Sequence, residues 1–300
     1  MRNTIFTLML LSYALIAQAV DHRQVGSMAQ DDQRAAFKKT SAPKLASAIA
    51  MIYDEQTQRP LFSKNSNEVV PIASITKLMT AMVVLDARLP LDEQITISSL
   101  DRDRFKGTRS RMRNGMTLSR GELLKLALMA SENVAAAALA RTYPGGTQVM
   151  LSMMNAKARE LGMASTRFDD PTGLHSTNVS TAHDLVKMVS AASEYEEIER
   201  FSTTSSHTVQ VSGRRSLRFN NTNPLVRNSS WDIGVSKTGY ISEAGKCLVM
   251  QAKISNRPVV IVLLDSWGRH TRVGDANRIK RWMEGTPEPV RKVRRRIRRG

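Results

Sequence analysis

The sequence predicts an α+β fold, in which one antiparallel sheet of about five strands takes its strands from both chain ends and packs against helices. Strand-like apolar runs lie at residues 47–63 and again at residues 233–266, and the region between them has helical patterns. The chain has 300 residues, 41% of them hydrophobic, which suffices for one sizeable core or two small ones. We expect one folded domain over residues 44–285.

The N-terminal part of this domain has the pattern of a hairpin followed by a buried helix. Residues 47–53 and 60–63 are strand candidates, and the polar residues 54–58 between them predict a turn. The apolar run at residues 78–85 then predicts a buried helix that begins near Ser74. In this arrangement the N-terminal hairpin pairs with the C-terminal strands.

The middle of the chain carries helix start signals. Ser119 with Glu122 has the spacing of a capping box, and Thr181 with Asp184 repeats that spacing. The predicted helices cover residues 123–130, 134–142, 148–161 and 185–192. The C-terminal part returns to strands at residues 233–238, 246–254 and 259–266, followed by a closing helix at residues 277–284.

The first 43 residues precede the predicted domain. Residues 1–19 combine a basic start, an apolar stretch and an Ala-Gln-Ala sequence, which is the pattern of a secretory signal peptide. An uncleaved N-terminal anchor is the alternative, and both interpretations predict export. Residues 20–43 are polar without periodicity and predict a disordered leader.

The formal net charge is +17, and the tail at residues 286–300 contributes seven positive charges to it. In a cytosolic protein this charge would indicate nucleic-acid binding, but the export signal argues against that class. We expect the tail to adhere to an anionic polymer or lipid surface, so that the protein is at most loosely associated with a membrane.

Cys247 is the single cysteine, so the chain cannot form an internal disulfide. It lies in an apolar, strand-like run, and we expect a buried structural residue instead of a reactive thiol. The five histidines are scattered without zinc-ligand spacing. We therefore expect neither a metal nor a cofactor.

Ser74 and Lys77 are spaced one helical turn apart at the start of the predicted buried helix. Residues i and i+3 share a helix face, so the amine of Lys77 can reach the hydroxyl of Ser74. A serine needs a base to take its proton, and a lysine serves as that base when burial or a nearby cation disfavours its charge. The pair is typical of nucleophilic catalysis, although one such spacing alone is a weak signal.

Two further motifs follow in order along the chain. Residues 131–133 read Ser-Glu-Asn at a predicted helix-to-helix junction, and residues 237–239 read Lys-Thr-Gly in a predicted strand. This is the motif order of the serine β-lactamases and penicillin-binding proteins. The chain closely resembles the low-molecular-mass penicillin-binding proteins, and most closely the D-alanyl-D-alanine endopeptidases of the penicillin-binding protein 7 type. The flanking segments that carry the resemblance are residues 71–80, 168–174, 178–182 and Tyr240.

The resemblance implies a β-lactamase/transpeptidase-like fold, a periplasmic location and acyl transfer on peptidoglycan stem peptides, with no role for nucleic acid. The implied catalytic residues are Ser74 as the nucleophile, Lys77 as the base that accepts its proton, and Ser131 as a proton relay to the leaving nitrogen. The implied substrate-binding residues are Asn133, Lys237, Thr238, Gly239 and Tyr240.

The substrate-binding residues have distinct implied roles. Asn133 would hydrogen-bond the stem peptide, and Lys237 would supply positive charge and lower the pKa of Lys77 by repulsion. Thr238 would add a hydroxyl contact, and Gly239 would let a ligand backbone lie close to the strand. The backbone N–H groups of Ser74 and Tyr240 would form the oxyanion hole.

Each motif also has a purely structural alternative when it is taken alone. Ser74 and Ser131 would then be helix caps, and Lys237 a solvated strand residue; the shared order and flanking residues argue against this. We expect Glu132 on a helix surface and no catalytic role for His175. The basic loop at residues 102–113 either lines a cleft or is simply solvated.

The leading functional hypothesis is a periplasmic serine DD-endopeptidase that hydrolyses D-alanyl cross-links. It rests on the detailed resemblance and on an expected lack of room for a second, C-terminal β-domain. The alternatives are a D-alanyl-D-alanine carboxypeptidase and a non-hydrolytic wall-binding or penicillin-sensing protein. The chain has no evident equivalent of the deacylating glutamate of class A β-lactamases, so we expect β-lactams to remain attached to Ser74 as inhibitors.

Overall fold

The computed structural model describes residues 41–212 and 215–286, and residues 44–280 form one unit of the chain. The predicted signal peptide, most of the predicted leader and nearly all of the basic tail lie outside the described residues. None of the helices in the described part is long and apolar enough to cross a membrane.

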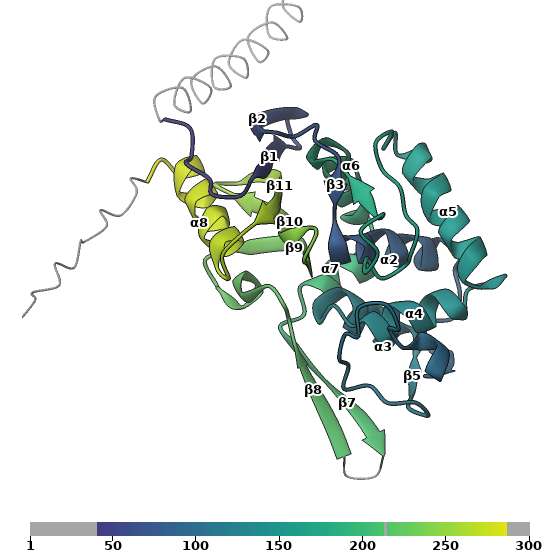
Figure 1. Cartoon of the computed structure of the whole chain (residues 1–300). Coiled ribbons are helices and arrows are strands. Elements are labelled where there is room, and N and C mark those ends of the chain that lie inside the picture. Colours follow the sequence, from purple (N-terminus) through teal and green to yellow (C-terminus); the bar gives the residue numbers. More distant parts are fainter. Residues whose placement is uncertain (1–40, 213–214, 287–300) are drawn as a thin grey trace, which may run out of the picture. The chain divides into compact units, whose positions relative to one another are not determined.

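A five-stranded antiparallel sheet forms the centre of the unit and confirms the α+β prediction (Figure 1). Its strand order is β2-β1-β11-β10-β9, so β9 lies at one edge. Ile49 of β1 lies opposite Leu264 of β11, which joins the N-terminal hairpin to the C-terminal strands as expected. The strands are β1 (Ile49–Asp54), β2 (Arg59–Lys64), β9 (Asp232–Ile241), β10 (Gly245–Ile254) and β11 (Arg257–Ser266).

Helices cover both faces of this sheet, with α6 (Ala182–Ala192) on one side and α8 (Thr271–Met283) on the other (Figure 1). Residues 259–264 of β11 are consequently all buried, which explains why this strand is an unbroken apolar run instead of an alternating pattern. Helix α8 begins at Thr271 and not at residue 277 as predicted. Gly274 and Asp275 weaken the helical signal there, because both have low helix propensity.

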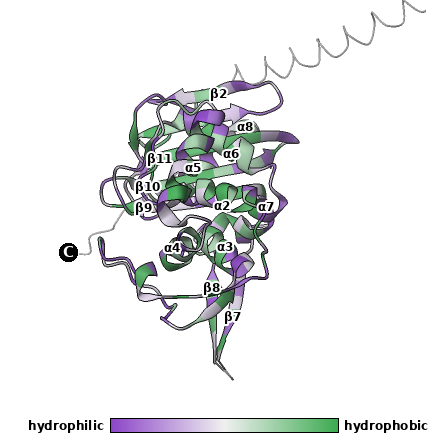
Figure 2. Cartoon of the chain, turned by 90° about the vertical axis from the view of Figure 1, so that its right-hand side faces the viewer, coloured by the Kyte–Doolittle hydropathy of each residue, from purple (hydrophilic) through white to green (hydrophobic). Residues whose placement is uncertain are grey.

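Helix α2 (Thr76–Asp86) is the central helix of the other layer. Residues 76–84 are all buried, and a helix that is buried on every side must be surrounded by other elements. Figure 2 shows α2 as largely hydrophobic. It contacts α6 and four further helices: α3 (Arg120–Met129), α4 (Asn133–Arg141), α5 (Gly146–Glu160) and α7 (Glu196–Ser202).

The capping signals in the sequence fix two helix starts. The Ser119 hydroxyl accepts a hydrogen bond from the backbone N–H of Glu122 at 3.1 Å, and the Glu122 carboxylate accepts one from the N–H of Ser119 at 3.0 Å. This reciprocal pair is the predicted capping box. The Thr181 hydroxyl likewise accepts the N–H of Asp184 at 3.1 Å and starts α6.

Six further strands were not predicted from the sequence. The strand pairs are β3 (Val70–Pro71) with β6 (Val179–Ser180), β4 (Gln94–Thr96) with β5 (Thr117–Ser119), and β7 (Ser206–Ser212) with β8 (Arg215–Asn220). Four of them have only two or three residues, whereas β7 and β8 have seven and six residues and form a hairpin of adjacent strands. Three 3-10 turns complete the described elements: η1 (Ala73–Ile75), η2 (Ser99–Asp101) and η3 (Pro224–Arg227).

A buried carboxylate ties the start of the sheet to α8. Asp275 is fully buried, and its carboxylate accepts hydrogen bonds from the N–H and the hydroxyl of Ser47 at 2.7 and 2.6 Å. It also accepts the N–H of Ala46 at 3.1 Å and a guanidinium N–H of Arg278 at 2.6 Å. The Ser47 hydroxyl in turn lies 2.7 Å from that of Ser266. One side chain therefore connects β1, β11 and α8.

We predict that Asp275→Ala lowers the free energy of unfolding by roughly 2 to 4 kcal/mol, because it leaves the buried donors of Ser47 without an acceptor. Urea unfolding followed by circular dichroism measures this. Asp92→Ala is the matched control, since Asp92 is exposed and its carboxylate has no hydrogen bond among the described residues. Equal midpoints for the two variants would contradict the role of Asp275.

Candidate active site

The predicted nucleophile and base meet where η1 runs directly into α2. Lys77 Nζ donates a hydrogen bond to Ser74 Oγ at 2.8 Å, as the one-turn spacing predicts. No side chain caps the start of η1 or of α2, so the alternative of Ser74 as a helix cap is wrong. The Ser74 hydroxyl accepts from Lys77 and donates a longer hydrogen bond, of 3.4 Å, to the backbone carbonyl of Thr172.

The ammonium group of Lys77 is completely enclosed. Besides Ser74, it donates to Asn133 Oδ1 at 2.7 Å and to the backbone carbonyl of Thr172 at 2.6 Å. Its side chain has no exposed surface, and this burial lowers the pKa of Lys77 to about 7, against the opposing charges of Asp170 and Glu132. Near neutral pH, a large fraction of Lys77 is therefore uncharged and able to accept a proton.

A second buried lysine lies across from the first. Lys237 is 1% exposed, and its Nζ donates to Ser131 Oγ at 2.9 Å and to the carbonyl of Thr238 at 2.8 Å. The solvated alternative for Lys237 is therefore wrong. Burial holds the pKa of Lys237 well below its usual value, and repulsion from Lys77 lowers it further. Burial, and not the repulsion that we expected from Lys237, is the main cause of the low pKa of Lys77.

Ser131 and Asn133 lie at the junction of α3 and α4, as predicted. Ser131 has a φ of +59°, a left-handed conformation that is uncommon for a serine, and its hydroxyl accepts from Lys237 instead of capping α4. Asn133 is the first residue of α4, and its Nδ2 donates to Thr108 Oγ1 at 3.0 Å while its Oδ1 accepts from Lys77. Asn133 is thus oriented from both ends of its amide.

Glu132 does not lie on a helix surface, so that expectation is wrong. Its carboxylate accepts the hydroxyl of Ser110 at 2.7 Å, because the loop at residues 102–113 folds over it. Burial raises the pKa of Glu132.

Strand β9 brings the third motif next to the nucleophile. A Cβ added to Gly239 would lie 3.0 Å from the carbonyl of Ile72 and 3.1 Å from the backbone nitrogen of Ser74, so glycine lets β9 pass this close without crowding the η1 turn. The Thr238 hydroxyl donates to Thr222 Oγ1 at 2.6 Å. Tyr240 follows in β9 with a side chain that is 60% exposed, beside the ammonium group of Lys246. The motif residues predicted from the sequence thus come together.

The loop at residues 169–178 supplies the part of the site that the sequence analysis missed. The Asp170 carboxylate accepts the N–H groups of Thr172, Gly173 and His175 at 2.6, 2.9 and 2.9 Å, and also the Thr172 hydroxyl. These bonds aim the Thr172 carbonyl at Lys77. The segments that carry the family resemblance include Asp170 and Thr172. The role of Thr172 could not be predicted from the sequence, because its backbone carbonyl, and not its side chain, accepts from Lys77.

Asn178 fastens this loop to α2. Its Oδ1 accepts the N–H groups of Asp169 and Asp170 at 2.7 and 3.0 Å, and its Nδ2 donates to the Thr76 hydroxyl at 3.0 Å and to the Asp170 carbonyl at 2.7 Å. Asn178 is fully buried, so every polar atom of its amide needs a partner and has one. The loop is therefore positioned by its own interactions.

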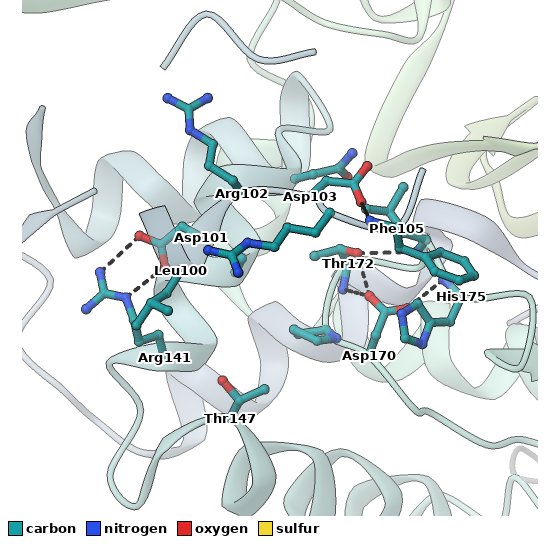
Figure 3. Close-up of a pocket in the computed structure, with 15 residues that line it drawn as sticks. Leu100, Asp101, Arg102, Asp103, Phe105, Arg141, Thr147, Asp170, Thr172 and His175 are labelled. Atoms are coloured by element: carbon teal, nitrogen blue, oxygen red, sulfur yellow. Dashed lines mark hydrogen bonds and ion pairs between the residues drawn. The ribbon is translucent and has the colours of Figure 1, made fainter. Parts of the chain in front are cut away.

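A pocket of about 600 Å³ opens beside the lysine cluster and shares Asn133 and Thr172 with it (Figure 3). The loop at residues 100–105 forms one wall, and residues 170–175 form another. The rings of Phe105 and His175 meet there, with centroids 4.7 Å apart. Both expectations for the basic loop hold in part, because Arg102 and Arg104 line the pocket and Arg109 is exposed outside it. Cys247 is fully buried, as predicted.

Comparisons with known proteins agree with this geometry. A family model described as D-alanyl-D-alanine carboxypeptidase matches residues 36–268. A D-alanyl-D-alanine endopeptidase of Pseudomonas aeruginosa is 49% identical over 242 residues, which are 80% of this chain and 78% of that protein.

Two solved structures are similar over their full length. The Streptomyces K15 DD-transpeptidase has a TM-score of 0.76 and 27% identity, and the match covers 82% of this chain and 100% of that one. The penicillin-binding protein D2 of Listeria monocytogenes, in a cefotaxime-bound form, has a TM-score of 0.71 at 27% identity, with the same shares covered.

Gly173 packs against the backbone of Ala73, the residue before the nucleophile, and its φ is +79°. A Cβ there would overlap the Ala73 carbonyl, which is only 1.9 Å away. We predict that Gly173→Ala lowers the free energy of unfolding by roughly 2 to 4 kcal/mol and abolishes the labelling of Ser74 by a serine-directed phosphonate.

Gly115→Ala separates steric overlap of the added Cβ from backbone strain. Gly115 also has a positive φ, of +83°, but has open space around its Cβ position. This control should cost only about 1 kcal/mol, through backbone strain alone, and should leave Ser74 labelling intact. If Gly173→Ala and Gly115→Ala have the same free energy of unfolding and the same Ser74 labelling, the close approach of Gly173 to Ala73 determines neither stability nor the reactivity of Ser74.

Proposed function

The chain belongs to the D-alanyl-D-alanine carboxypeptidase family of serine peptidases, and we propose that it acts as a DD-endopeptidase that hydrolyses D-alanyl cross-links between peptidoglycan stem peptides. One observation carries this proposal. A lysine amine with a pKa of about 7 lies 2.8 Å from a serine hydroxyl, in an enclosed site. The hydroxyl and amine are the nucleophile and the base that acyl transfer requires.

In the proposed first step, Lys77 takes the hydroxyl proton as Ser74 Oγ attacks the carbonyl carbon of the D-alanyl bond. The new C–O bond and the breaking C–N bond leave an ester on Ser74 and release an amine, which takes a proton relayed by Ser131. Water then attacks the ester, and Ser74 regains its proton. The 2.8 Å contact between the two groups supports Lys77 as the base.

The negative charge on the carbonyl oxygen would be held by the backbone N–H groups of Ser74 and Tyr240. The close passage of β9 beside the nitrogen of Ser74 at Gly239 supports this placement. Removal of one oxyanion donor typically costs about 2.7 to 4 kcal/mol in the barrier. Asn133 and the edge strand β9, with Thr238, would hold the peptide on either side of Ser74.

β-Lactams would acylate Ser74 and remain attached, because among the described residues the two carboxylates whose charges act on Lys77, those of Asp170 and Glu132, are already held by other groups; the Glu132 carboxylate accepts from Ser110. Asp170 is close to Lys77 in the neighbouring loop, but its carboxylate oxygens are occupied by hydrogen bonds within that loop. A slow deacylation step is what makes a β-lactam an inhibitor in place of a substrate.

A D-alanyl-D-alanine carboxypeptidase is the second candidate, and Lys237 favours it. This buried cation beside β9 could meet the free carboxylate of a terminal D-alanine. The family model bears the carboxypeptidase description, whereas the Pseudomonas aeruginosa relative is an endopeptidase.

We further propose that residues 1–19 export the protein to the periplasm, that residues 44–285 form the catalytic domain, and that the basic tail adheres to anionic membrane or wall polymer. The pattern of the first 19 residues and the charge of residues 286–300 support these assignments.

We predict that a labelled penicillin forms a stable adduct on Ser74, detected by intact-protein mass spectrometry and peptide mapping, and that Ser74→Ala forms none. The protein should then convert cross-linked muropeptide dimers to monomers. Release of terminal D-alanine with persistence of the dimers would instead identify a carboxypeptidase. An adduct without either reaction would identify a penicillin-sensing protein.

We predict that the rate of acylation by penicillin follows the pKa of Lys77. Above pH 7 the amine is neutral and the rate should be constant, whereas below it the rate should fall about tenfold per pH unit. Stopped-flow measurement with a fluorescent penicillin from pH 5.5 to 8.5 tests this, with circular dichroism at each pH as the folding control. Lys77→Arg, which stays charged, should lower the rate at least 100-fold. A flat pH profile would exclude Lys77 as the base.

A further inference from the structure

The pocket beside the lysine cluster is a groove that runs along α4. Asn133, Ala137 and Arg141 line it and follow one another at intervals of four residues, so they share one face of the helix. The eight residue steps from Asn133 to Arg141 span about 12 Å, which is the length of three to four residues of extended peptide. The groove begins at Asn133, which holds Lys77, and is therefore continuous with the site of acyl transfer.

Two large apolar side chains at this groove are exposed. Leu100 is 72% exposed and Phe105 is 63% exposed, and both line the groove together with the buried Pro171 and Leu174. Exposed apolar side chains at a groove are typical of a surface that a ligand covers. The groove is therefore suited to a ligand with an apolar part.

The wall that carries these residues is held in place on several sides. Lys106 forms an ion pair of 2.5 Å with Glu243 in the turn after β9, Thr108 accepts from Asn133, and Ser110 donates to Glu132. These contacts anchor the loop at residues 102–113 to both motif-bearing segments, so the groove is preformed.

The polar groups of the groove offer donors, because its acceptors are already occupied. The Asp101 carboxylate is paired with Arg141, and the Asp170 carboxylate accepts from its own loop (Figure 3). Asp103 accepts the N–H groups of Phe105, Lys106 and Thr108.

The guanidinium groups on the same wall are less occupied. Arg102 has one hydrogen bond, to the neutral amide of Asn114, and Arg104 has no partner among the described residues. A guanidinium pairs best with a carboxylate. The three carboxylates and three guanidinium groups that line the groove balance in formal charge. A carboxylate on a ligand would therefore be attracted by the unpaired N–H donors of the arginines and not by a net positive charge.

We propose that this groove binds the acyl-side stem peptide, N-terminal to the cleaved D-alanyl bond, and that Arg104 recognises a free side-chain carboxylate on it. This inference rests on the proposed function. Ser131, the relay to the leaving amine, lies on the side of Lys237, and neither residue lines the groove. The leaving peptide is therefore expected on the β9 side and the acyl peptide on the α4 side. Arg104 is a specificity-determining residue in this arrangement.

Two synthetic cross-linked dimers test the proposal. They differ in one group: the side chain preceding the cleaved D-alanine ends in a carboxylate in one dimer and in a carboxamide in the other. We expect the wild-type protein to prefer the carboxylate dimer in kcat/KM. Arg104→Ala should reduce this preference about tenfold, equivalent to about 1.4 kcal/mol, and Arg104→Lys should restore part of it.

Arg109→Ala is the matched control, because Arg109 is an exposed arginine of the same loop that does not line the groove. It should leave the preference unchanged. If Arg104→Ala slows both dimers equally, or if the wild-type protein cleaves both equally well, the proposal is wrong although the DD-endopeptidase function stands. If the wild-type protein cleaves neither dimer, the proposed function itself is wrong.

Discussion

The burial of the Lys77 ammonium group is the constraint on which the site depends. A charged amine without exposed surface is costly unless each of its N–H groups has an acceptor. Here the three acceptors come from three separate parts of the chain: the η1 turn with Ser74, the start of α4 with Asn133, and the loop carbonyl of Thr172. The same burial lowers the pKa of Lys77 to about 7, so one physical cause both assembles the site and makes the lysine a base.

The segments around Lys77 are themselves held in conformations that are costly without support. Ala73 and Ser131 have positive φ angles, which typically cost on the order of 1 to 3 kcal/mol each for residues other than glycine. Ala73 precedes Ser74, which accepts from Lys77, and Ser131 itself accepts from Lys237. The Asp170 and Asn178 side chains stabilise the loop behind Thr172 with hydrogen bonds that have no contact with solvent. The hydrogen bonds of this loop support the segment that packs against Ala73, and the bond from Lys237 holds Ser131.

The sheet explains why motifs more than 150 residues apart meet. β1 pairs with β11, and β10 then places β9 at the edge. The Lys-Thr-Gly motif on β9 thus lies beside the η1 turn that follows the N-terminal hairpin, with Gly239 in contact with it. The edge strand, α4 and the loop at residues 169–178 surround Ser74 on different sides. One peptide can therefore approach Ser74 along β9, and another can approach it along the groove beside α4.

Much of the fold and most of the site could be predicted from the sequence, because they depend on local patterns. The apolar periods, the Ser119 capping box and the one-turn spacing of Ser74 and Lys77 are properties of neighbouring residues, and they fix helices, strands and the nucleophile pair. The motif order identified Ser131, Asn133 and Lys237. Only the tertiary structure decided which groups surround each lysine, because burial depends on segments that are distant in the chain. The Thr172 carbonyl, the contact of Glu132 with the loop at residues 102–113, the low pKa of Lys77 through burial and the groove along α4 all arise in this way.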